Sequence, residues 1–462
     1  MKKVTLFYAL LTPFLLNQAQ ENDWRNLDNA VSVIPDEGYC DQPYVVINDK
    51  GEWVCCLTTG AGHEGDRGQH VVSTISRDRG NSWTPMVDIE PAAGPEASWV
   101  VPYKVPSGRI YAFYTYNNED WRSVLNEKGK PIKRVDTFGK MMFRYSDDGG
   151  YSWSGNRYEV PIRNFRIDEE NIYNGVVQFF WSVAKPISHK RAMYLPLSKV
   201  GNFGEGFMVS GSGAILRSVN IMTESDPSKI RWETLPDGDL GLLPPEGRVA
   251  DEHNIVSMND GSLYCVYRTN QGHNVHAYSR DDGHTWTEPE WATYTPGGKV
   301  MKQPRCFNKL YRFSNGKYLL FFHNNSTKHY SSHPVFNRNP TWLSGGIEKD
   351  GVIYWSQPEL FLYDMNYTKG ISYPDWIEDG DGYYFTETQK SIARLHKIPP
   401  DYLEMLWGQA ENESLATEGL LIEKQGDACS PGMEIKMPDL GKLTQGDGLN
   451  LSAASCGESS IH

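Results

Sequence analysis

Residues 76–83 read Ser-Arg-Asp-Arg-Gly-Asn-Ser-Trp, and the pattern Ser-x-Asp-x-Gly-x-Ser/Thr-Trp occurs again at residues 146–153 and 279–286. In each copy the Asp side chain can accept hydrogen bonds from its own turn, and the Gly permits a backbone angle that a Cβ disfavours. The terminal Trp can cover the turn as a hydrophobic plug. Weaker copies lie at residues 349–355 and 225–232. The chain is therefore a repeat protein.

The interval between these turns is the length of one four-stranded sheet, which is typical of a β-propeller. The sequence predicts an all-β fold: a six- or seven-bladed β-propeller of four-stranded antiparallel blades with Asp-box turns. Six blades can be counted, starting near Tyr39, Ser98, Asn174, Glu252, Arg305 and Ile371. Residues 21–37 lead into the first blade and are a candidate for a strand that closes the ring.

The chain divides into three parts. Residues 1–19 combine a basic start with an apolar segment too short to span a bilayer, which predicts a signal peptide and a secreted or periplasmic protein. Residues 20–407 form the predicted propeller catalytic domain, with a short helix at residues 402–407 near its end. Residues 408–462 form a polar C-terminal tail, for which disorder and a truncated second domain are both left open.

Composition restricts the partners of the protein. The 462 residues carry a net charge of −13, which argues against binding to nucleic acid or to an anionic membrane. The 14 Trp and 26 Tyr suit stacked sheets and a sugar-binding surface. We expect a monomer that acts on an acidic plant or algal polysaccharide or oligosaccharide, with no integral membrane segment once the signal is removed.

The cysteines and histidines predict no cofactor. The seven Cys form no disulfide framework, so buried free thiols are expected. His253, His273, His276, His323 and Cys306 lie in or beside adjacent predicted blades, but they form no compact ligand motif. A structural Ca²⁺ or Zn²⁺ ion is left open.

From about Tyr39 to about Lys397 the chain resembles the Asp-box propellers of the sialidase superfamily. This resemblance implies a site that contains Glu252, followed one hairpin later by Arg268 of the carboxylate clamp. It also implies Arg338 as a second clamp arginine and Tyr373 at the place of the Tyr nucleophile. We add His63 and Arg305, so the candidate substrate-binding residues are His63, Glu252, Arg268, Arg305, Arg338 and Tyr373.

Two positions depart from the sialidase pattern. Where sialidases have Arg-Ile-Pro, this chain has Asp41, Gln42 and Pro43, and an Asp there would repel the substrate carboxylate. His70 occupies the place of the acid/base Asp, counted back from Trp83. A His can exchange a proton at neutral pH. These departures argue against ordinary hydrolysis of sialic acid, and a sialidase-like exo-glycosidase is kept as an alternative.

A second resemblance concerns His70, Tyr116 and Arg134, which look like the His, Tyr and Arg of propeller polysaccharide lyases that act on ulvan. In that chemistry an Arg neutralises a uronate carboxylate, a base removes the C5 proton, and an acid protonates the departing O4. A uronate polysaccharide lyase that works by β-elimination is therefore an alternative.

The runs at residues 37–44 and 68–70 resemble propeller α-L-rhamnosidases, which release L-rhamnose from O4 of D-glucuronic acid. That family is thought to use one His on the opposite face of the propeller, at a position that we place near Gln42. The favoured function is therefore an exported glycoside hydrolase, an α-L-rhamnosidase, ahead of the lyase and the sialidase-like alternative. A non-catalytic glycan-binding propeller is the alternative from a different class. The candidate catalytic residues are His70, Tyr116, Arg134 and Gln42.

Overall fold

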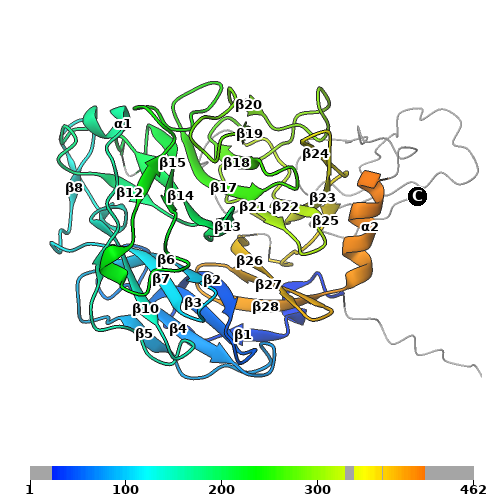
Figure 1. Cartoon of the computed structure of the whole chain (residues 1–462), viewed down its shortest axis with the longest axis horizontal. Helices are drawn as coiled ribbons and strands as arrows, with labels where there is room; N and C mark the ends of the chain where they lie inside the picture. Colours follow the sequence, from blue (N-terminus) through cyan, green and yellow to red (C-terminus); the bar gives the residue numbers. More distant parts are fainter. Residues whose placement is uncertain (1–22, 206, 328–337, 367, 412–462) are drawn as a thin grey trace, which may run out of the picture.

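Six antiparallel sheets surround a common centre in the described part of the chain, so the fold is a six-bladed β-propeller (Figure 1). The structure is a computed structural model that describes residues 23–205, 207–327, 338–366 and 368–411. The predicted all-β propeller is confirmed, with six blades. The predicted signal peptide and nearly all of the predicted tail lie outside the described residues.

Within the first three blades, the antiparallel strands follow one another outward from the centre in chain order. The first blade contains β2 (Tyr39–Ile47), β3 (Trp53–Gly60), β4 (His70–Ser76) and β5 (Val87–Glu90). The second contains β6 (Ala97–Lys104), β7 (Ile110–Tyr116), β10 (Lys140–Ser146) and β11 (Tyr158–Glu159). The third contains β12 (Phe179–Trp181), β13 (Ile187–His189), β14 (Ala192–Val200), β15 (Gly211–Ser218) and β16 (Glu233–Leu235).

The remaining three blades complete the ring, and the last of them includes a strand from the start of the chain. The fourth blade contains β17 (Ala250–Ser257), β18 (Leu263–Thr269), β19 (Asn274–Ser279) and β20 (Glu290–Trp291). The fifth contains β21 (Lys309–Arg312), β22 (Tyr318–Phe322), β23 (Trp342–Lys349), β24 (Val352–Trp355) and β25 (Glu359–Leu360). The sixth contains β26 (Ser372–Asp379), β27 (Gly382–Thr388), β28 (Ala393–Ile398) and, paired with β28, β1 (Ser32–Ile34). The expected closing strand is confirmed.

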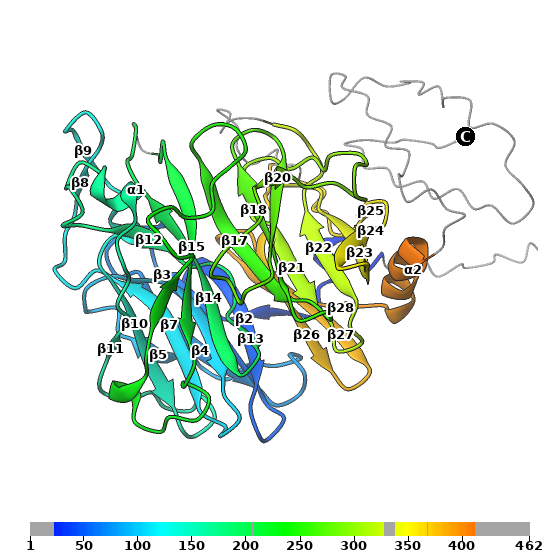
Figure 2. The same cartoon turned by 45° about the horizontal axis from the view of Figure 1, so that its top comes forward.

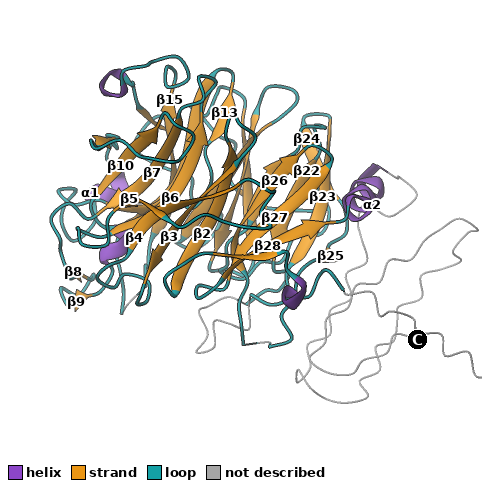
Figure 3. Cartoon of the chain, turned by 90° about the horizontal axis from the view of Figure 1, so that it is seen from below, coloured by secondary structure: helices purple, strands orange, loops and turns teal. Residues whose placement is uncertain are grey.

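Few helices and strands lie outside the six blades (Figure 3). In the predicted insertion at residues 117–133, β8 (Val124–Leu125) and β9 (Pro131–Ile132) form a hairpin at the edge of the molecule (Figure 2). Short helical segments are η1 (Leu27–Asn29), η2 (Val135–Thr137), α1 (Arg166–Glu169) and η3 (Pro227–Lys229). The predicted helix at residues 402–407 is part of α2 (Pro400–Glu411). No helix in the described ranges is long and apolar enough to cross a membrane.

Helix α2 packs against β23 at the outside of the fifth blade (Figure 1). A Cβ at Gly345 would meet the backbone of Leu406 at 2.8 Å, so glycine allows this close approach. Six hydrophobic clusters fill the interfaces between neighbouring blades, and a seventh lies under the loops. The cysteines among the described residues are buried free thiols, as expected: Cys40, Cys55, Cys56, Cys265 and Cys306.

The three Asp boxes join the third and fourth strands of their blades, at the end of the ring opposite to the start of the inner strands. In the first box, Asp78 accepts hydrogen bonds from the backbone N–H of Ser82 at 2.9 Å and from its hydroxyl at 2.6 Å. The hydroxyl of Ser76 accepts from the N–H of Gly80 at 2.6 Å. The indole N–H of Trp83 donates to the hydroxyl of Ser32 in β1 at 3.1 Å, so the box also holds the closing strand in place.

Candidate active site

Four inner strands contain a bulge at an equivalent position near their start. The antiparallel register shifts within β2, β6, β17 and β26. The residues at these shifts have positive φ angles: Gln42 (55°), Trp99 (63°), Glu252 (52°) and Tyr373 (47°). A residue with a Cβ loses roughly 1 kcal/mol or more in this conformation, and bulges redirect side chains. Repeated strain at one end of a ring is typical of a functional site.

Asp251 is a buried carboxylate that holds two arginines of the site. Arg268 donates to its two oxygens at 2.8 and 3.1 Å, and Arg305 donates at 2.7 Å. Burial opposes the negative charge, but the two guanidinium groups outweigh it and lower the pKa of Asp251 to about 2. Asp251 therefore stays ionised at neutral pH, and both arginine side chains are held in fixed directions.

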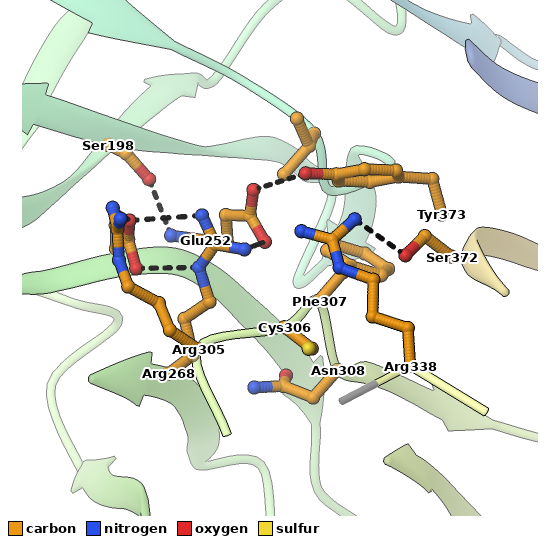
Figure 4. A network of polar contacts seen from close by, with 12 residues as sticks. Ser198, Glu252, Arg268, Arg305, Cys306, Phe307, Asn308, Arg338, Ser372 and Tyr373 are labelled. Atoms are coloured by element: carbon orange, nitrogen blue, oxygen red, sulfur yellow. Dashed lines mark hydrogen bonds and ion pairs between the residues drawn. The ribbon is translucent and has the colours of Figure 1, made fainter. Parts of the chain in front are cut away.

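Tyr373 and Glu252 come from the inner strands of the sixth and fourth blades, and their side chains meet (Figure 4). The Tyr373 hydroxyl donates to Oε1 of Glu252 at 2.9 Å, and Oε2 forms an ion pair with Arg268 at 2.7 Å. Burial raises the pKa of Glu252 to about 7, although Arg268 opposes the shift. A carboxyl group that titrates near neutral pH and contacts a phenol is suited to accept the phenolic proton.

Arg338 lies close to the Tyr373 ring, with its guanidinium between Glu252 and Ser372 (Figure 4). Its guanidinium donates to the hydroxyl of Ser372 at 2.9 Å and lies 5.9 Å from the centre of the Tyr373 ring. Burial raises the pKa of Tyr373, and Glu252 raises it further, whereas nearby cations lower it. Positive charge near the ring favours the phenolate that a nucleophilic tyrosine must form.

Lys390 belongs to the site but was not among the residues predicted from the sequence. Its ammonium group donates to the buried carboxylate of Asp41, lies 3.5 Å from Glu64, and lies 4.4 Å from the centre of the Tyr373 ring. The negative charge of Asp41, expected to repel a substrate carboxylate, is therefore paired with a cation. No short motif marks Lys390, because it belongs to the turn between β27 and β28.

Asp136 lies close to Glu64 on the same side of the site as Lys390. Arg134 forms an ion pair with Asp136 at 3.0 Å, and the indole of Trp99 donates to the backbone carbonyl of Asp136 at 2.9 Å. Burial raises the pKa of Asp136 to about 6 even though Arg134 opposes the shift. Trp99 and Asp136 were also not among the site residues predicted from the sequence. Alignment of the inner strands would have pointed to Trp99, because it occupies the same bulge as Glu252 and Tyr373.

The proposed lyase residues have separate neighbours. His70, on β4, contacts the Gly68 carbonyl at 2.9 Å, and its Nε2 lies 3.6 Å from Asp88 and 3.8 Å from Glu37. Tyr116 ends β7, where the Arg157 guanidinium lies 4.5 Å from its ring centre. Arg134 lies beside Asp136, with which it forms an ion pair. His70 and Tyr116 also lie at the end of the ring where the inner strands start, since His70 pairs with Thr59 and Tyr116 pairs with Ala97.

The remaining predicted residues are Gln42 and His63. Gln42 is buried and donates to the carbonyl of Ser182 at 3.3 Å, which links the first blade to the third across the centre. The His63 side chain is 96% exposed and lies 3.5 Å from Asp66, outside this network. The structure thus brings together most of the predicted substrate-binding set: Glu252, Arg268, Arg305, Arg338 and Tyr373.

The histidines considered for a metal site have different partners. His253 stacks on Tyr267 with ring centres 4.3 Å apart, and burial lowers its pKa to about 3. One ring nitrogen of His323 contacts the Ile371 carbonyl at 2.9 Å. Within the described ranges, no group of three or more His, Cys, Asp or Glu side chains is arranged to hold a metal ion.

Comparison with solved structures gives the same fold. The chain is similar to the Hadza microbial sialidase Hz136 (15% identity, TM-score 0.52), over 79% of this chain and 66% of that one. It is similar to a protein of unknown function from Dyadobacter fermentans (15% identity, TM-score 0.55; 79% and 97% covered). It is also similar to the NanB sialidase from Streptococcus pneumoniae (13% identity, TM-score 0.53; 80% and 70% covered). At these identities the similarity concerns the fold.

Sequence comparison identifies the family. No curated protein matches the chain. Residues 53–386 match the family described as BNR repeat-like domain, and this range covers the larger part of the propeller. Because the match extends over more than half of the chain, the protein belongs to the BNR repeat-like domain family, and its fold is a β-propeller like that of the sialidases above.

Proposed function

We propose that the protein is a glycoside hydrolase that cleaves an acidic glycan, with Tyr373 as nucleophile and Glu252 as its base. The observation that supports this proposal most directly is the continuous contact from the Tyr373 hydroxyl to Glu252 and on to Arg268, at 2.9 and 2.7 Å. A tyrosine suits an acidic sugar because a neutral phenol is not repelled by the substrate's negative charge.

In the first step, ionised Glu252 takes the phenolic proton while the Tyr373 oxygen bonds to the anomeric carbon. The bond from that carbon to the leaving oxygen breaks, and the leaving oxygen takes up a proton. Asp136 suits this second role, because its pKa of about 6 keeps a fraction of it protonated near neutral pH. In the second step the Asp136 carboxylate takes a proton from water as the water oxygen bonds to the anomeric carbon, the bond to the Tyr373 oxygen breaks, and Glu252 returns its proton to the phenolate.

Arginine suits recognition of the acidic group because its planar fork can contact both oxygens of a carboxylate. Two classes of acidic glycan are candidate substrates. The resemblances at residues 37–44 and 68–70 favour L-rhamnose linked to D-glucuronate, in which the uronate would face the arginines. The Tyr373–Glu252 contact favours a terminal sugar that itself carries the carboxylate, as in a sialidase-like exo-glycosidase.

The test is incubation of the wild type and the Tyr373→Phe variant with sialyllactose, rhamnose-capped arabinogalactan and ulvan. Released sugars are quantified together with the ultraviolet absorbance of unsaturated uronates. Sugar release by the wild type that is lost in Tyr373→Phe would support the proposal, and the released sugar would identify the substrate class. Release that persists in Tyr373→Phe would refute the tyrosine mechanism, and rising absorbance would establish elimination instead.

A further inference from the structure

We propose that Lys390 supplies a cation that binds the acidic group of the substrate, in place of the arginine that sialidases carry in Arg-Ile-Pro. The inference rests on the proposed function, because it assigns a specificity residue to that site. Asp41 occupies the sequence position of the arginine in the sialidase Arg-Ile-Pro tripeptide, and it accepts a hydrogen bond from Lys390. The positive charge lost from β2 is thus restored by the turn between β27 and β28.

The backbone of Lys390 is tied to β2. Its carbonyl accepts from the N–H of Cys40 at 3.0 Å, and its own N–H donates to the hydroxyl of Thr388 at 2.8 Å. That hydroxyl donates in turn to the Cys40 carbonyl at 2.8 Å. Lys390 has a φ of 69°, a conformation that costs a residue with a Cβ roughly 1 kcal/mol or more. The turn therefore keeps a strained lysine backbone in place beside Asp41.

Three aromatic rings surround the ammonium group. The Lys390 nitrogen lies 4.4 Å from the ring centre of Tyr373, 5.6 Å from that of Trp99 and 5.8 Å from that of Tyr39. Trp99 and Tyr373 are the bulge residues of the second and sixth blades, so the cation lies at the same end of the ring as Glu252. Ring faces attract a cation and limit the directions that its flexible side chain can take.

A ligand carboxylate can displace Glu64 from Lys390. Its carboxylate lies 3.5 Å from the ammonium group, and its side chain is 33% exposed, whereas Asp41 is fully buried. An incoming carboxylate can therefore replace Glu64 while Asp41 remains bound. The exchange conserves local charge, because one carboxylate replaces another, so it avoids the cost of bringing a new charge into a buried site.

A lysine also changes which substrates fit. Arginine binds a carboxylate through a rigid planar fork, whereas an ammonium group is a point charge with three rotatable donors. Lys390 can therefore accept a carboxylate in several orientations and can also donate to sugar hydroxyls. The site should bind uronates as well as sugars that carry the carboxylate at the anomeric carbon.

The test compares binding of charged and uncharged ligand pairs by calorimetry. The pairs are methyl β-D-glucuronoside with methyl β-D-glucoside, and 2,3-didehydro-N-acetylneuraminic acid with its methyl ester. Lys390→Met should weaken binding of the acids about tenfold or more, since a hydrogen bond between charged groups is lost, and should leave the neutral partners unchanged. Lys390→Arg should retain most of the affinity. Lys190→Met, a change at an exposed lysine on the Asp-box side, is the matched control and should have no effect.

The double variant Asp41→Asn/Lys390→Met removes the buried carboxylate that the single variant leaves without its lysine. It should fold as the wild type does and still bind the acids weakly. Equal affinity of the wild type and Lys390→Met for the acids would overturn the proposal, and so would equal losses for acids and neutral partners. Binding is measured without turnover, so a failure to hydrolyse any glycan would refute the proposed function and leave the binding result intact.

Discussion

Replacing Glu252 by Gln should remove a pH-dependent loss of stability that the wild type shows between pH 5 and 8. Burial raises the pKa of Glu252 from 4.5 to about 7, so the folded protein holds this proton more tightly than the unfolded chain does. The resulting stabilisation is fully present below pH 4.5 and is lost as the pH rises through 7. With about 1.4 kcal/mol for each pKa unit, roughly 2 to 3 kcal/mol of the unfolding free energy disappears between pH 5 and 8.

Glutamine keeps an oxygen that can accept from Tyr373, but it cannot form the ion pair with Arg268. In the wild type the ion pair exists only while Glu252 is ionised, so its contribution is already part of the pKa of Glu252, whereas the uncharged glutamine does not titrate at all. Arg268 keeps its two bonds to Asp251 in the variant. The informative quantity is therefore the change in stability with pH, compared between variant and wild type.

The assay is urea unfolding, followed by tryptophan fluorescence, at pH 5, 6, 7 and 8. The unfolding free energy of Glu252→Gln should rise relative to that of the wild type by about 2 to 3 kcal/mol across this range. Glu288→Gln, at an exposed glutamate, is the control and should follow the wild type. Parallel pH curves for Glu252→Gln and the wild type would refute the reasoning, because Glu252 would then be ionised throughout and would have no raised pKa.

Three further results are expected. Tyr373→Phe should lower kcat by about a thousandfold or more, because it removes the attacking oxygen, and should leave binding of acidic ligands unchanged in calorimetry. His70→Ala should keep its hydrolytic activity, because His70 contacts Gly68 and lies near Asp88, outside the Tyr373 network; loss of activity would revive the lyase alternative. Asp148→Ala should lower the unfolding free energy by about 2 kcal/mol, since its carboxylate accepts four hydrogen bonds within the second Asp box. Its activity should stay that of the wild type, which a progress curve at saturating substrate would check.

Local patterns predicted much of the propeller. The Asp boxes were recognisable because their hydrogen bonds join residues within one turn, as between Asp78 and Ser82. The closing strand was expected from the chain that precedes the first blade, and β1 pairs with β28 as expected. The resemblance to sialidases suggested residues that the structure places together, including Glu252 and Tyr373, whose catalytic roles stay predictions.

Other parts of the site carried no local signal. Lys390 is an ordinary turn residue in the sequence, and it becomes a site residue only because the sixth blade closes against the first. Asp136 reaches the site through the insertion after β7, whose course no repeat predicts. His70, Tyr116 and Arg134 were grouped by residue type; in the structure His70 lies near Asp88 and Tyr116 lies near Arg157, and the lyase role of the three residues stays a prediction.

The sequence by itself determined the fold class and the position of the turns, because those depend on hydrogen bonds and strand patterns between residues close in the chain. Only the tertiary structure decided which charges meet. Asp41, Glu252 and Tyr373 belong to three different blades, and their spacing depends on how many blades close the ring and where each inner strand bulges. Electrostatic interactions depend on distance in space and on burial, and both are set only once the ring has closed.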